Sequence, residues 1–140
     1  MPGNTVPVFP RVADVQWISG ITAANTTADL TTGTSYLVFT ADATNGGFVS
    51  QIDFKATPAG TTTATVARIW INNGSTTGTA ANNNLIGEVT LAAITASATA
   101  ETAKIVAMLN KYLPPGYRIY ITIHTASANG WSATAWGNKL

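Results

Sequence analysis

The chain contains no cysteine and only one histidine. The lack of cysteine excludes a disulfide scaffold, a thiolate zinc site and a cysteine nucleophile. A Ser-His-Asp hydrolase needs a histidine base, and His124 is the only histidine present. The six carboxylates lie singly along the chain, so no cluster marks a metal site or a glycosidase pair. We therefore expect a protein that is not an enzyme, with no catalytic, cofactor-binding or metal-binding residues.

Charge is scarce as well. Charged residues make up 9% of the 140 residues, against about 25% in an average soluble domain. The seven basic residues form no cluster, which argues against nucleic acid as a partner. Apolar runs never reach the roughly 18 residues that cross a bilayer, and the N-terminus has no signal-peptide pattern. We expect a protein made in a cytoplasm, without membrane contact, whose low-charge surface associates with other subunits.

The first eleven residues contain three prolines and a glycine, which predicts an extended N-terminal arm and not a helix. Such an arm either extends into water or docks on a neighbouring molecule. Its apolar residues favour docking, and the expected contact residues are Val6, Val8, Phe9 and Arg11. Residues 12–140 are expected to form one domain, because a chain of this length is best served by one core.

From residue 12 onward, short β-rich runs alternate with turn clusters at intervals of about 8 to 12 residues. A segment at 92–111 predicts a helix or, in its second half, a strand, and both alternatives stay open. About eight strands without βαβ alternation predict an all-β fold, a two-sheet antiparallel β-sandwich of the jelly-roll type. The expected strands are 12–19, 34–41, 47–56, 63–72, 85–91, 103–109, 117–125 and 131–137.

Alternation within two strands predicts which side chains face the core. In 117–125, the isoleucines face the core, and Tyr120 and His124 lie on the polar face. Asn129-Gly130 predicts a tight hairpin between 117–125 and 131–137. In 47–56, the predicted core face consists of Phe48, Ser50, Ile52, Phe54 and Ala56.

The four tryptophans have two interpretations, packing in a core or interface and stacking on a sugar. Trp131 and Trp136 have opposite parity on one predicted strand, so they should point to opposite faces. One of the pair is then a candidate for a subunit contact. The predicted contact residues are Tyr120, His124 and Trp136.

Two motifs, IWINNG at 69–74 and LPPGY at 113–117, lie in a chain that closes with a segment beginning at Trp131. With these markers, residues 29–137 resemble small virion-associated proteins of tailed bacteriophages and prophages, of the capsid decoration or cement type. The resemblance implies a β-sandwich, trimer-like self-association into a homotrimer, and attachment to the outer face of a shell of major capsid protein. It implies location on the virion, and no catalytic residue carries over.

Two functions follow as expectations. The first is a structural protein that binds and reinforces a phage head. The alternative is a receptor- or carbohydrate-binding β-sandwich module of a phage fibre or spike, in which exposed tryptophans contact the ligand.

Overall fold

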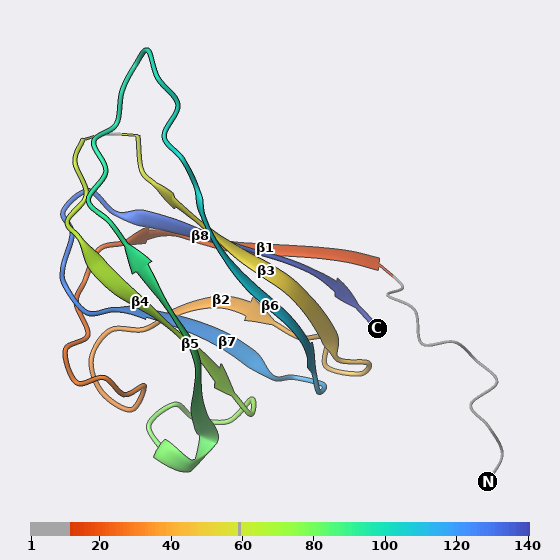
Figure 1. Ribbon diagram of the computed structural model, residues 1–140. Helices are drawn as coiled ribbons and strands as arrows, with labels where there is room; N and C mark the ends of the chain where they lie inside the picture. The colour runs from red at the N-terminus through yellow and green to blue at the C-terminus, as the bar shows by residue number, and fades with distance from the viewer. Residues whose placement is uncertain (1–11, 59) are drawn as a thin grey trace, which may run out of the picture.

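The computed structural model describes residues 12–58 and 60–140, which form two antiparallel four-stranded sheets packed face to face (Figure 1). In spatial order, sheet A contains β1 (Val12–Ile21), β8 (Trp131–Lys139), β3 (Gly47–Ala56) and β6 (Ile105–Leu113). Sheet B contains β2 (Tyr36–Thr40), β7 (Arg118–Ile123), β4 (Thr65–Asn72) and β5 (Asn83–Leu91). One short 3-10 helix, η1 (Ala80–Asn82), precedes β5.

The strand order is that of a jelly roll, because the chain changes sheet at nearly every connection and only β4 and β5 are consecutive partners. The predicted fold class is confirmed. Each predicted strand corresponds to an observed one, with ends that differ by a few residues. The second half of the segment at 92–111 is a strand, because β6 begins at Ile105. Residues 92–104 connect β5 to β6 and form the teal loop that rises above the sheets in Figure 1.

The predicted terminal hairpin is wrong. β7 pairs with β2 and β4 in sheet B, whereas β8 pairs with β1 and β3 in sheet A. Residues 124–130 cross between the sheets instead of forming a tight turn. Along this crossing, the Ser127 N–H donates to Thr22 O (2.9 Å), and the Thr57 N–H donates to Gly130 O (2.9 Å). Asn129-Gly130 therefore ends a crossover connection and does not join two paired strands.

A β-bulge changes the predicted faces of β3. The register with β8 and β6 shifts between Val49 and Gln51, so the extra residue inverts the alternation at that point. Val49 is buried in the core, while Phe48 lies on the outside and packs against Tyr112 with ring centroids 4.9 Å apart. The core assignment of Phe48 and Ser50 is therefore wrong. It is correct beyond the bulge, for Ile52, Phe54 and Ala56.

The core lies between the sheets. Trp131 is fully buried and Trp136 is exposed, which confirms their predicted opposite orientation. The Phe39 ring of sheet B lies over two glycines of sheet A, and a Cβ built on Gly47 or Gly137 would lie 3.3 Å from it. The other large, fully buried side chains come from both sheets and include Phe54, Ile21, Ile52, Ile69, Leu91, Leu113, Ile119, Ile121 and Ile123.

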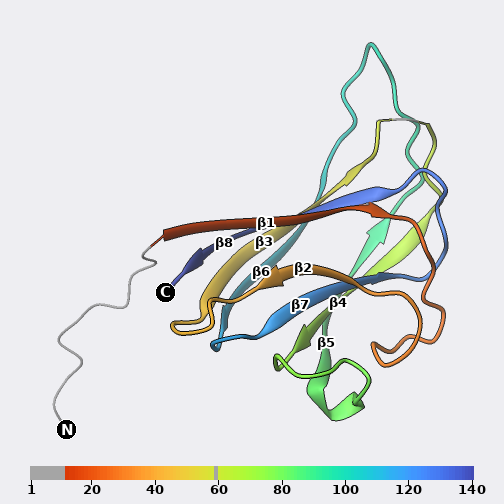
Figure 2. The same cartoon turned by 180° about the vertical axis from the view of Figure 1, so that it is seen from behind.

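The two sides of the sandwich differ. On one side, β1 lies against β2 (Figure 2), and the Gln16 side chain joins the sheets. Its Nε2 donates to Thr40 O (2.9 Å), and its Oε1 accepts from the Thr40 N–H (2.9 Å). A side-chain amide thus replaces a strand at the free edge of β2. On the opposite side, a cleft of about 430 Å³ lies between β5 and β6.

Candidate functional site

The outer surface of sheet A is built from three neighbouring rows of side chains, each row crossing all four strands. We call these twelve residues the sheet-A face. From β1 to β6, the first row is Ala13, Asn138, Phe48 and Tyr112; the second is Val15, Trp136, Gln51 and Met108; and the third is Trp17, Thr134, Asp53 and Val106.

Most of the large side chains on this face are apolar and exposed. Trp17 is 69% exposed, Tyr112 67% and Met108 62%, and Val15, Val106 and Trp136 are exposed as well. Strands lie about 4.8 Å apart and the rows about 7 Å apart, so four strands and three rows cover on the order of 400 Å². Four of the twelve residues are polar, so the apolar part is smaller than this area, but exposed apolar side chains gathered on one face often mark a site of interaction. The sheet-A face is therefore our first candidate functional site.

Asp53 lies in the interior of this face and is only 7% exposed. Its Oδ2 accepts from Trp136 Nε1 (3.0 Å) and from Lys104 Nζ (2.8 Å), and its Oδ1 accepts from Gln51 Nε2 (2.6 Å). The carboxylate fixes the Trp136 indole, and the ammonium of Lys104 neutralises the carboxylate. The face is consequently ordered and carries no net charge.

The Asp53→Ala variant is expected to lower the free energy of unfolding by about 1–3 kcal/mol, because three donors lose one acceptor. Lys104→Ala is expected to cost less than about 1 kcal/mol, since its side chain is 55% exposed and exposed ion pairs contribute little. Chemical denaturation measures both values. Equal losses for the two variants would contradict the role of Asp53 as the anchor for Trp136 and Gln51.

The outer surface of sheet B is more polar. Arg68 Nε forms an ion pair with Glu88 (2.9 Å), and Arg68 Nη1 lies 3.4 Å from Nδ1 of His124. Trp70 Nε1 donates to Thr122 Oγ1 (3.1 Å), and the Trp70 side chain is largely buried. Arg68 is paired with Glu88 on this surface and Trp70 with Thr122, so it is the weaker candidate for an apolar contact.

The structure does not bring the predicted subunit-contact residues together. Tyr120 lies on β7, and the exposed His124 directly follows that strand, so both belong to sheet B. Trp136 lies on the outer side of sheet A. These residues remain predictions, but they would belong to two separate contacts. The predicted arm residues Val6, Val8, Phe9 and Arg11 lie outside the described residues.

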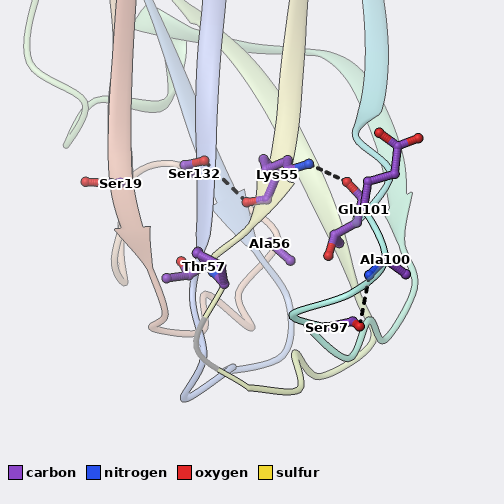
Figure 3. Close-up of a pocket in the computed structure, with 10 residues that line it drawn as sticks. Ser19, Lys55, Ala56, Thr57, Ser97, Ala100, Glu101 and Ser132 are labelled. Carbon is purple, nitrogen blue, oxygen red and sulfur yellow. Dashed lines mark hydrogen bonds between the residues drawn. The ribbon is translucent and has the colours of Figure 1, made fainter.

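A hollow of about 430 Å³ borders the sheet-A face beyond the row of Trp17 (Figure 3). Its floor contains Ser19 of β1, Ser132 of β8 and Lys55 of β3. The connection between β5 and β6 forms one wall, and residues that follow β3 form another. Lys55 Nζ donates to Thr102 O, and Ser132 Oγ donates to Lys55 O (3.3 Å).

Sequence reasoning missed most of the sheet-A face. On β1 the outward residues Val15 and Trp17 are apolar, while the inward residue Gln16 is polar, so simple alternation would place the wrong side in the core. On β6, the unresolved choice between helix and strand left Met108 and Tyr112 without a face. An available signal was that both parities of these strands carry large apolar residues, which indicates two contact surfaces.

Within residues 12–58 and 60–140, no group of three or more His, Cys, Asp or Glu side chains is placed to hold a metal ion. The same part of the chain has no helix with the length and apolar character that a membrane crossing requires. Comparison of the chain with protein-family models, curated proteins and solved structures found no match.

Proposed function

We propose that the protein is a structural component of a virion that binds the outer surface of a bacteriophage head as a decoration protein. The sheet-A face carries the general part of this proposal, attachment to another protein. It is apolar, ordered by Asp53 and free of net charge, as the centre of a protein interface is. The phage head as partner, and specifically its major capsid protein, rests on the sequence resemblance.

The fold agrees with this proposal without deciding it. Jelly rolls occur in viral capsid proteins and also in lectins, and a fold by itself does not define a function.

The size of the sheet-A face adds a requirement for binding. On the order of 400 Å² is about half of what one partner contributes to a standard interface. Binding through this face therefore needs a second contact.

The N-terminal residues are the proposed second contact. They precede Val12, which is the first residue of β1 and lies beside the first row of the sheet-A face. In the proposal, Val6, Val8, Phe9 and Arg11 contact the capsid next to the area covered by the face. Self-association into a homotrimer would add avidity, because linked copies bind a repeating shell more tightly than single copies.

The test uses heads purified from the phage or prophage that encodes the chain, prepared without it. We expect the wild-type protein to bind in stoichiometric copy number. The double variant Met108→Ser with Tyr112→Ser is expected to bind at least about 30-fold more weakly, the effect of removing an interface hot spot of about 2 kcal/mol.

Leu85→Ser provides the matched control, since Leu85 is 40% exposed and lies on sheet B. This variant is expected to bind like the wild type. The proposal is wrong if the wild type leaves the heads undecorated. Unchanged binding of the Met108 and Tyr112 variant, with loss in the Leu85 variant, would move the contact to the other sheet.

A further inference from the structure

The hollow beside the sheet-A face is open to solvent, and backbone contacts hold its two loop walls together. Its two loop walls are tied together near Thr61 and Thr95, which form an isolated β-bridge. The Thr62 N–H donates to Ile94 O (2.9 Å), and the Ile94 N–H donates back to Thr62 Oγ1 (2.9 Å). The volume of about 430 Å³ falls within the range of small-molecule sites, roughly 300–1,000 Å³.

The lining of the hollow has a specific chemistry. Hydroxyl groups dominate its polar part, with Lys55 and Glu101 as the charged residues. One ammonium and one carboxylate balance each other, which disfavours a strongly anionic ligand such as a phosphate and a metal cation alike. The lining surface as a whole is more apolar than polar and includes Ala56, Pro58 and Ala100, but it has no aromatic or branched aliphatic side chain that would hold a flat apolar ligand. Donors and acceptors without net charge suit a neutral ligand with many hydroxyl groups. The hydroxyl-bearing residues are Ser19, Thr57, Ser97, Thr102 and Ser132.

Figure 3 shows Lys55 between Ser132 and the Glu101 side of the hollow. The Lys55 ammonium has three N–H donors and gives one to Thr102 O, so it can donate to a ligand as well. Glu101 is exposed and forms no ion pair within the described residues, and Figure 3 shows its carboxylate pointing away from Ser97 and Thr57, so its oxygens are acceptors at the rim of the hollow. The hollow thus presents both hydrogen-bonding roles that a sugar hydroxyl requires.

Trp17 supplies the apolar half of a sugar site. It lies two residues before Ser19 on the outward side of β1, about 7 Å along the strand. At 69% exposed, it is the most exposed large apolar side chain in the described part of the chain. An indole offers a broad, flat apolar surface with little conformational freedom to lose. The C–H face of a sugar ring can pack on that surface while its hydroxyls reach the hollow.

We propose that Trp17 and the hollow at Ser19, Lys55, Glu101 and Ser132 form a binding site for a neutral carbohydrate. This site goes beyond the proposed attachment to a capsid. It lies at the β1 end of sheet A and shares Trp17 with the sheet-A face, whereas Met108 and Tyr112, the residues that test the capsid contact, lie on β6. A glycan bound at Trp17 would therefore compete with a capsid that covers the whole face.

The test applies the full-length protein to an array of neutral and acidic glycans, followed by calorimetric titration with the best-binding neutral glycan. We expect binding to neutral glycans. Trp17→Ala and Glu101→Gln are each expected to weaken the affinity at least about tenfold. Both side chains are exposed, so thermal unfolding is expected to stay unchanged and to exclude misfolding as the cause.

Met108→Ser is the matched control, an exposed apolar residue of the same sheet on the distant strand β6. It is expected to bind glycan like the wild type. The proposal is overturned if no neutral glycan binds, if only acidic glycans bind, or if Trp17→Ala and Glu101→Gln both retain full affinity. Head binding by Glu101→Gln is measured in parallel, because Glu101 lines the hollow and lies outside the sheet-A face, so that loss of the sugar site and loss of the capsid contact are distinguished.

Discussion

Replacement of Trp131 by alanine is expected to lower the free energy of unfolding by about 3–5 kcal/mol, the range for removing a large aromatic side chain from a core. Trp131 has no exposed surface and begins β8, where it pairs with Ile21 of β1 and Ala56 of β3. For a domain of this size, such a loss lowers the melting temperature by about 10–20 °C. Thermal and chemical unfolding measure the two quantities.

A second substitution at this position tests the physical reason. The Nε1 of Trp131 is buried and has no hydrogen-bond partner within the described residues. An unpaired buried donor costs about 1–3 kcal/mol, so Trp131→Phe removes a penalty together with some packing. We expect it to cost less than about 1.5 kcal/mol. A phenylalanine variant as unstable as the alanine variant would contradict this expectation.

Trp17→Ala is the control for position on the same sheet. Its side chain is 69% exposed, so its loss is expected to change stability by no more than about 0.5 kcal/mol. The two tryptophans then separate the two roles available to this residue type in the chain, core packing and surface contact.

Substitution of Gly137 by alanine is expected to destabilise the protein by about 1–3 kcal/mol or more, because the added methyl group has no room. The Cβ would overlap the main-chain carbonyl oxygen of Phe48, and it would also lie 3.3 Å from the Phe39 ring. Backbone on the neighbouring strand cannot rotate away as a side chain can. The strand pair β3–β8 would have to separate locally. Unfolding in denaturant measures the loss.

Gly78→Ala is the matched control. This glycine is exposed, and an added Cβ would make only an ordinary contact of 3.5 Å with Thr76. We expect stability to be unchanged or slightly higher, because alanine narrows the unfolded ensemble. If Gly137→Ala were as stable as Gly78→Ala, the backbone of β3 at Phe48 would not be packed against Gly137 as closely as described.

Much of the fold could be predicted from sequence, because strands of a sandwich repeat a local signal. The alternation of isoleucines in β7 and the turn residues between strands placed all eight strands near their observed positions. Pairing is a different matter. The sequence of Asn129-Gly130 fits a tight hairpin, but the choice of sheet for β8 depends on contacts with β1 and β3, which are distant in sequence. Local turn chemistry does not contain that information.

The bulge in β3 illustrates the same limit. Phe48 and Ser50 fit the alternation of Ile52 and Phe54, and only the pairing with β6 and β8 shows that an extra residue shifts them to the outside. The candidate site was harder still to predict. Its apolar residues occupy positions on β1 and β6 that a hydrophobicity rule assigns to a core. Low overall charge predicted that a contact surface exists, and the register of sheet A was needed to locate it.

The bridge from Gln16 to Thr40 also determines at which edge the sandwich begins to open. Two hydrogen bonds hold the β1 and β2 edges together, whereas a cleft separates the β5 and β6 edges. Thermal fluctuations are therefore expected to separate the two sheets more easily on the β5 and β6 side. In such an opening, the edge held by Gln16 acts as the hinge between the two sheets. Amides along β5 and β6 are expected to exchange with solvent through small local openings, and those of β8 and β3 only when the whole domain unfolds.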